Sequence, residues 1–111
     1  MRLTKAQQTL ILLAQLSQEL KALILWQSCR PTIEQMASTA PFHYDTLTFE
    51  QWLQFVFIER IGLMIEKKQP LPSEMSLLPM ATESFISLGN KANKLVGVIG
   101  QLDGLLSGRN L

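Results

Sequence analysis

The chain has 111 residues, of which 47% are hydrophobic, and its 10 basic and 9 acidic side chains leave a formal net charge of +1. A chain of this length and apolar content is expected to fold as one domain, residues 1–111, around a single core. The nearly balanced charge argues against direct nucleic-acid binding, which needs a clustered basic face.

A single cysteine rules out a disulfide within the chain and favours a reducing compartment. The apolar run at residues 10–14 is flanked by glutamines and lacks a recognisable cleavage site, so it does not resemble a signal peptide. We therefore expect a cytoplasmic protein.

The first helix is predicted over residues 4–28. Its apolar side chains at 12, 13, 16, 20, 23 and 24 fall on one arc at about 100° per residue, which Leu10 and Ala6 continue, and polar residues at 15, 18 and 19 lie opposite. The helix is expected to end before Arg30, because a residue that precedes proline avoids the helical region.

A short helix is predicted over residues 32–38, where Thr32 and Gln35 have the spacing of a capping box. The connection that follows, residues 38–47, combines turn formers with aromatic side chains. A connection of this kind either packs onto the helices or contributes to a site.

The central helix is predicted over residues 49–65, where apolar side chains occur on almost every side. Thr48 and Gln51 form a second capping box at its start. One expected arc contains Phe49, Leu53, Val56, Leu63 and Met64, and a separate line contains Ile58, Ile61 and Ile65 with Gln54. Polar side chains interrupt the apolar run, so it is too short to span a membrane. Other segments of the chain are therefore expected to cover this helix.

Arg60 falls within the arc of Phe49, Leu53 and Val56, where a cation requires an acceptor. Asp45, just before the helix, is one candidate. The alternative is that Arg60 lays its methylenes along the core and places its guanidinium in water, as long cationic side chains commonly do.

A stiff linker is predicted after the central helix, because its two prolines have fixed φ angles. It comprises Pro70, Leu71 and Pro72. Pro79 is best accommodated in the first turn of a helix over residues 80–88. Gly89 is expected to end this helix, and Asn90 to cap the next one.

The last helix is predicted over residues 91–107, with Gly108 as its C-terminal cap. Its core arc contains Leu95, Val98, Ile99, Leu102, Leu105 and Leu106. Gly97, Gly100 and Gly104 lie opposite this arc. They either permit close approach of another backbone, as small-residue stripes do, or mark a weak helix held by its leucine face.

Few residues are available for catalysis or metal binding. Cys29 and His43 cannot supply the four ligands of a zinc site, so no metal or cofactor is expected. A set of Cys29, His43 and Asp45 would suit a small hydrolase, but we expect Cys29 to be a buried, inert residue and His43 to make an ordinary hydrogen bond. Glu59 and Glu66 share a solvated edge, since the Glu-x-x-His pairs of carboxylate metal sites are missing. We therefore expect no enzymatic activity.

The chain resembles the YqcC-like family of small bacterial proteins. The matching residues are Pro41, Phe42, Asp45, Thr46, Leu47, the block QWLQFVFI at 51–58, Arg60, Pro70, Leu71, Pro72, Pro79 and Met80. The resemblance covers about residues 10–106 and implies a compact all-α bundle without an established activity. Members are discussed beside a tRNA pseudouridine synthase, which implies an association with RNA modification. Where the family commonly has proline, this chain has Glu59, so we expect its central helix to be straighter.

The polar residues of this block suggest a shallow binding groove. The candidate residues are Phe42, Asp45, Trp52, Gln54, Arg60, Pro70, Leu71 and Pro72. A concave apolar surface with a few convergent polar groups is the usual form of a ligand site, although the ligand itself is not predicted. The alternative is a structural lock, in which Asp45 binds Arg60 or caps the helix.

Together these patterns predict an all-α protein, a four-helix antiparallel bundle with a short extra helix in the first connection. The expected function is a non-enzymatic module that binds a partner protein or a second copy of itself through apolar surface. The alternative is an accessory factor in tRNA pseudouridine formation that acts through a partner protein, because the neutral charge disfavours direct contact with RNA.

Overall fold

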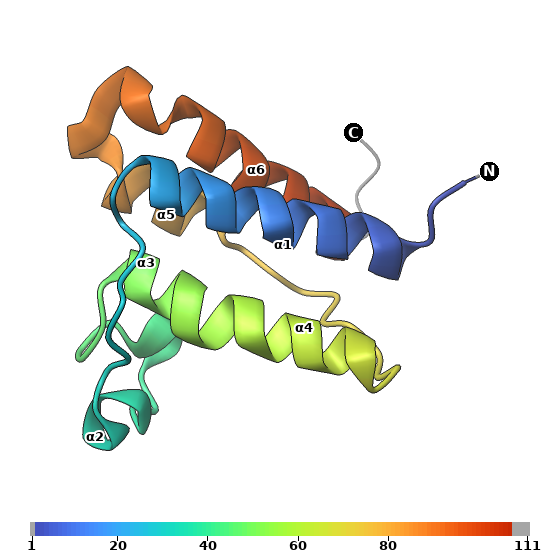
Figure 1. Ribbon diagram of the computed structural model, residues 1–111, viewed down its shortest axis with the longest axis horizontal. Helices are drawn as coiled ribbons and strands as arrows, with labels where there is room; N and C mark the ends of the chain where they lie inside the picture. The colour runs from blue at the N-terminus through green and yellow to red at the C-terminus, as the bar shows by residue number, and fades with distance from the viewer. Residues whose placement is uncertain (1, 108–111) are drawn as a thin grey trace.

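Three capping boxes define where the first helices begin in the computed structural model, which describes residues 2–107 (Figure 1). In each box a threonine hydroxyl accepts from the backbone N–H three residues on, and the glutamine there accepts from the threonine N–H. The helices are α1 (Lys5–Ala22), α2 (Ile33–Met36) and α3 (Phe49–Trp52), capped by Thr4, Thr32 and Thr48. The two caps predicted at Thr32 and Thr48 are confirmed.

Helix α1 ends at Ala22, six residues before its predicted end. The backbone of Ile24 turns into the left-handed region at φ 59°. The Leu25 N–H then donates to the Leu20 carbonyl at 2.8 Å, and the Ile24 N–H donates to Lys21 at 3.0 Å. This pattern is a Schellman motif, which normally places glycine where Ile24 lies. The end of α1 at Ala22 could not be predicted from the sequence, because a β-branched residue such as Ile24 is unfavourable in the left-handed conformation.

The central helix is continuous but is not a regular α-helix. A π-helical turn, η2 (Leu53–Phe57), joins α3 to α4 (Ile58–Glu66). A π turn contains more residues than an α turn, so it changes which face the downstream residues occupy. Ile61 is accordingly 2% exposed, whereas Leu63 is 48% exposed. The predicted arc was wrong at Leu63 for this reason, and the helix that was expected to be straighter contains an irregular turn.

The second half of the chain departs further from prediction. Helix α5 (Leu78–Ser84) has Pro79 in its first turn, as predicted, but ends four residues earlier than expected. A 3-10 segment, η3 (Ile86–Ala92), follows, and Gly89 within it has φ 56°. Helix α6 (Asn93–Leu106) has no side-chain cap, so the prediction that Asn90 caps it was wrong. The predicted cap at Gly108 lies outside the described residues.

Helices α1 and α6 lie side by side and antiparallel, and α4 runs alongside α1 in the opposite direction (Figure 1). The Lys5 ammonium at the start of α1 approaches the Leu106 carbonyl at the end of α6, at 3.5 Å. The leucine faces meet the central helix in one core. Its fully buried side chains include Leu16, Leu20, Leu53, Leu95, Ile99, Leu102 and Leu106. This confirms the all-α fold, and no helix in residues 2–107 is long and apolar enough to cross a membrane.

Candidate functional site

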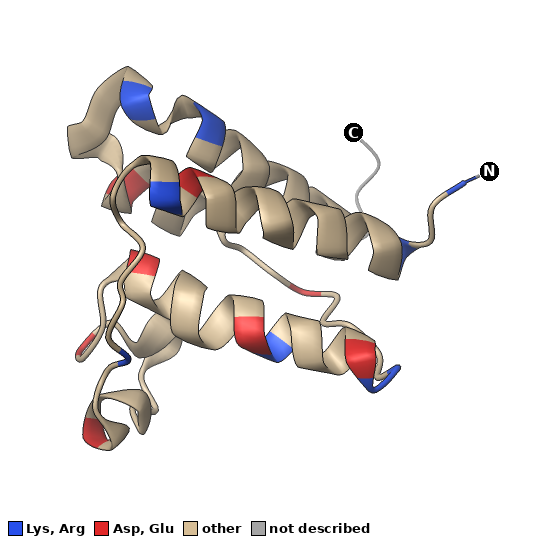
Figure 2. Ribbon diagram, viewed as in Figure 1, with Lys and Arg blue, Asp and Glu red and all other residues tan. Residues whose placement is uncertain are grey.

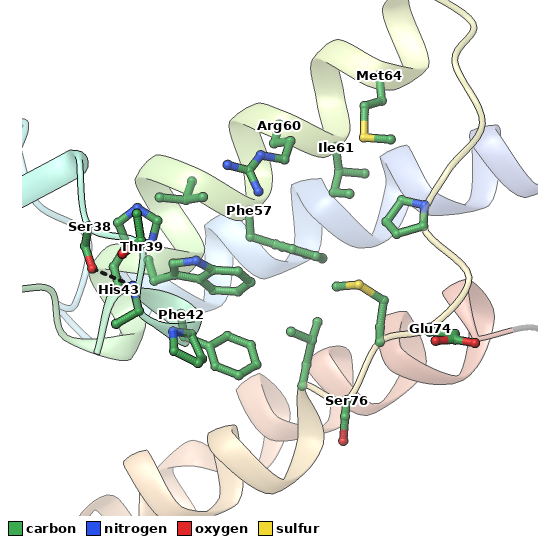
Figure 3. Close-up of a pocket in the computed structure, with 17 residues that line it drawn as sticks. Ser38, Thr39, Phe42, His43, Phe57, Arg60, Ile61, Met64, Glu74 and Ser76 are labelled. Atoms are coloured by element: carbon green, nitrogen blue, oxygen red, sulfur yellow. Dashed lines mark hydrogen bonds between the residues drawn. The ribbon is translucent and has the colours of Figure 1, made fainter. Parts of the chain in front are cut away.

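An open hollow of about 590 Å³ lies between the connection after α2, the central helix and the segment before α5 (Figure 3). Most of its lining is aromatic, aliphatic or thioether. The lining residues are Ser38, Thr39, Ala40, Pro41, Phe42, His43, Trp52, Val56, Phe57, Arg60, Ile61, Met64, Pro72, Glu74, Met75, Ser76 and Leu77. We call this hollow the main groove.

An aromatic cluster forms the floor of the main groove. The Phe42 ring meets the Trp52 ring edge to face, with centroids 4.9 Å apart, and lies 5.8 Å from the Phe49 ring. Trp52 stacks in turn on Phe57 at 5.5 Å. Offset and edge-to-face contacts of this kind add stability beyond apolar burial. The connection between α2 and α3, with its short 3-10 helix η1 (Pro41–His43), is therefore packed onto the helices.

Hydrogen bonds hold the same connection in place. The Ser38 hydroxyl donates to the Asp45 carboxylate at 2.6 Å, and the Thr46 hydroxyl donates to the Gln35 carbonyl at 2.7 Å. His43 Nε2 lies 3.1 Å from the Met36 carbonyl, and because a carbonyl only accepts, Nε2 carries the proton. The expected ordinary hydrogen bond of His43 is thus confirmed.

Arg60 does not pair with Asp45, because Asp45 is an exposed acceptor for Ser38 and Arg60 is itself exposed. Between residues 2 and 107 the Arg60 guanidinium makes no ion pair or hydrogen bond. Figure 3 shows it pointing from α4 toward the end of the main groove where His43 lies. The predicted lock between Asp45 and Arg60 is absent, since each side chain lies apart from the core.

A second, smaller hollow of about 280 Å³ adjoins Arg60 on the other side. We call it the side hollow. Its lining residues are Met36, His43, Phe55, Val56, Glu59, Arg60 and Leu63. Three of these residues, His43, Val56 and Arg60, also line the main groove.

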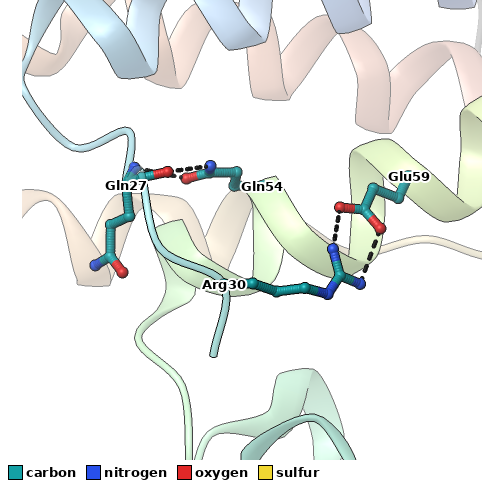
Figure 4. Close-up of polar contacts among 4 residues, drawn as sticks. All are labelled: Gln27, Arg30, Gln54 and Glu59. Atoms are coloured by element: carbon teal, nitrogen blue, oxygen red, sulfur yellow. Dashed lines mark hydrogen bonds and ion pairs between the residues drawn. The ribbon is translucent and has the colours of Figure 1, made fainter. Parts of the chain in front are cut away.

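Gln54 has a structural role that the sequence did not indicate (Figure 4). Its side chain is 5% exposed, accepts from the Gln27 N–H at 2.9 Å and donates to the Gln27 carbonyl at 2.8 Å. Gln51 adds a hydrogen bond to the Gln27 side chain at 3.0 Å. Gln54 therefore binds the connection between α1 and α2 and does not line the main groove.

An ion pair between Arg30 and Glu59 attaches the same connection to α4 three residues further along the chain (Figure 4). The guanidinium donates to both carboxylate oxygens, at 2.7 and 3.0 Å, and lies 5.7 Å from the centroid of the Phe55 ring. The hydrogen bond and the charge of Glu59 raise the pKa of Arg30, whose guanidinium, like that of any arginine, is charged at physiological pH. Both side chains are about half exposed, so their pairing is a surface contact.

The structure divides the predicted site residues into two groups. Phe42, Trp52, Arg60 and Pro72 line the main groove. The predicted residues that do not line it are Asp45, Gln54, Pro70 and Leu71. The groove wall lies further along the linker than expected, at Glu74 and Met75, and these two residues carry no sequence pattern that marks them.

The three glycines of α6 do not form one exposed stripe. Gly97 is exposed, and a Cβ added there would meet nothing within 4 Å. A Cβ at Gly100 would lie 3.6 Å from Leu78, while Gly104 is buried. Gly100 therefore lies where α5 packs against α6.

Asp103, also on this part of α6, is a buried residue that sequence reasoning missed. Its carboxylate accepts from the Leu78 N–H at 3.4 Å, at the start of α5. Anionic groups are favourable at a helix N-terminus, so Asp103 helps to position α5.

Cys29 is exposed, so the expectation of a buried cysteine was wrong. It lies between Gln27 and Arg30, in the connection between α1 and α2. Its proposed partner His43 is bound to Met36 through Nε2. Within residues 2–107 no three His, Cys, Asp or Glu side chains are grouped so that they could hold a metal ion.

These features define a small all-helical protein with an open aromatic and methionine-lined groove beside its central helix. The chain belongs to the YqcC-like family: the DUF446 family model, described as "tRNA pseudouridine synthase C", matches residues 8–105. It is 38% identical over 73 residues to an uncharacterised Haemophilus influenzae protein, covering 66% of this chain and 69% of that one. This confirms the resemblance seen in the sequence.

Two further similarities involve named proteins. The solution NMR structure of YqcC from Escherichia coli has a TM-score of 0.84 and 26% identity, over 98% of this chain and 93% of that one. A tRNA pseudouridine synthase C from Pectobacterium carotovorum is 40% identical over 47 residues. That match covers 42% of this chain and only 12% of the synthase.

Proposed function

We propose that this protein is a non-enzymatic binding module, which takes a segment of a partner protein into the main groove. The groove itself is the observation that carries the proposal: its volume of about 590 Å³ falls in the range of ligand sites. Aromatic rings give it a rigid floor, while Met64 and Met75 line its wall. Methionine side chains adapt their shape to a partner, so they are common at binding surfaces.

The test uses a photo-crosslinking amino acid at position 76, with position 87 as the matched control. Ser76 and Ser87 are both exposed serines, but only Ser76 lines the main groove. Crosslinking in cells should give a distinct protein adduct from position 76 that is lost when Thr39→Trp fills the groove. Identical adducts from both positions would contradict the proposal. Sedimentation of the adduct distinguishes a second copy of this chain from another protein.

The second candidate function is an accessory role in tRNA pseudouridine formation through a partner protein. The similarity to a segment within a tRNA pseudouridine synthase C favours it, since that segment and the synthase belong to one polypeptide there. The net charge of +1 disfavours direct binding to tRNA, and Figure 2 shows basic and acidic residues interspersed over several helices.

The accessory role is tested by adding this protein to a purified tRNA pseudouridine synthase and measuring the rate of pseudouridine formation. The intact protein should change the rate, and the Ser76→Trp variant should not, whereas Ser87→Trp should behave as the intact protein does. A rate unaffected by any of them eliminates the accessory role. Retention of bulk tRNA by this protein alone, at physiological salt, would replace it with direct RNA binding.

A further inference from the structure

The main groove and the side hollow meet at Arg60. His43, Val56 and Arg60 line both of them, so the two depressions adjoin along one strip of surface. On one side of this strip the larger hollow has an aromatic floor, and on the other the smaller one is lined by Met36, Phe55 and Leu63, among others. A chain segment that occupied both hollows would have to cross Arg60.

The charge at the crossing is positive. Glu59, the nearest acidic neighbour along the helix, is held by two hydrogen bonds from Arg30. Arg60 has no acceptor in residues 2–107, and Glu74 lies at the far end of the main groove in Figure 3. A guanidinium bordered by apolar surface favours a carboxylate, which it can bind through two parallel hydrogen bonds.

We propose that the partner segment is a short linear peptide that carries an aspartate or glutamate between two large apolar side chains. This inference rests on the proposed function and specifies the chemistry of the partner. One apolar side chain enters the main groove against Phe42, Trp52 and Met75. The carboxylate binds Arg60, and the second apolar side chain enters the side hollow. The apolar contacts supply affinity, and the ion pair fixes the direction and register of the peptide.

The test measures the binding of fluorescein-labelled peptides by fluorescence anisotropy. Each peptide has Asp, Asn or Lys at its central position and one leucine on either side of it. One to three polar residues separate each leucine from the central residue. At the best spacing the Asp peptide should bind the intact protein about tenfold more tightly than the Lys peptide. In the Arg60→Glu variant this preference should reverse, because a carboxylate at position 60 attracts the Lys peptide and repels the Asp peptide.

The matched control is Lys67→Glu, which makes the same change of charge near the end of the same helix, outside both hollows. It should keep the preference for the Asp peptide. If Asp, Asn and Lys peptides bind the intact protein equally well but do not bind the Ser76→Trp variant, the groove binds peptides and the proposed preference for an acidic residue is wrong. If no peptide binds and position 76 gives no distinct adduct, the proposed function fails as well. Displacement of the Asp peptide by bulk tRNA would show that Arg60 binds phosphate instead.

Discussion

Glu59 and Arg60 are neighbours on α4, yet they belong to two regions of the molecule with opposite properties. Glu59 lies in the anchored region, where the chain between α1 and α2 is held by Arg30 and by the buried amide of Gln54. Arg60 lies in the groove region, where its guanidinium meets no acceptor in the described chain. One region satisfies its polar groups within the protein, whereas the other keeps a cation available beside apolar surface.

The comparison separates stability from binding. A buried polar group whose partner is removed costs free energy, because the remaining group loses both water and its hydrogen bond. An exposed cation incurs no such cost, so its substitution affects the folded state little. Substitutions in the anchored region should therefore change the free energy of unfolding, and those in the groove region should change binding.

The largest effect is expected for Gln54→Leu. This change leaves the N–H and carbonyl of Gln27 without their partner and should lower the free energy of unfolding by about 2 kcal/mol. Urea denaturation followed by circular dichroism measures it. Gln18→Leu, at an exposed position of α1, is the control and should have little effect. Equal effects of the two variants would remove the anchoring role of Gln54.

A stabilising change of about 1 kcal/mol is expected for Ile24→Gly, where the anchored connection begins. Ile24 is 90% exposed with φ 59°, so glycine loses little packing and relieves a left-handed conformation that is costly for a β-branched residue. Lys68→Gly, at the equivalent position after α4 with φ 56°, should stabilise less, because lysine is not β-branched. The urea midpoints of the two variants give the order, and a loss of stability in Ile24→Gly contradicts the prediction.

A smaller change is expected for Glu59→Gln, which removes the ion pair with Arg30. Both partners are about half exposed, so the urea midpoint should fall only slightly at low salt. The difference from the intact protein should disappear at about 1 M salt, where exposed charges are screened. Because the pKa of Arg30 is raised and lies far above neutrality, Arg30 should contribute no pH dependence near pH 7. A salt-independent loss would show that the pair supports the fold by another route.

The smallest effect on stability is expected for Arg60→Gln, with a change below about 0.5 kcal/mol in the free energy of unfolding. The same variant should bind the Asp peptide more weakly than the intact protein does. Urea denaturation and peptide anisotropy are therefore measured on one preparation of Arg60→Gln. The comparison with Gln54→Leu then shows whether stability and peptide binding change separately. A large loss of stability in Arg60→Gln would place Arg60 in the anchored region.

Much of the local structure was predictable from the sequence. The capping boxes at Thr32 and Thr48 and the place of Pro79 depend on residues only a few positions apart, and the structure confirms them. The candidate site was only half predictable. Phe42 and Trp52 are aromatic residues close in sequence, but the groove wall at Met75 depends on how the linker crosses the helices.

The sequence by itself determined the all-α fold and the leucine faces of α1 and α6, because capping and helical periodicity are properties of neighbouring residues. Only the tertiary structure decided that Gln54 binds the backbone N–H and carbonyl of Gln27, 27 positions away, while Arg60 stays unpaired within the described chain. The π turn at residues 53–57 changes which face the later side chains occupy, and it leaves no mark in the hydrophobic pattern. Packing between distant segments therefore set the division between the anchored region and the groove region.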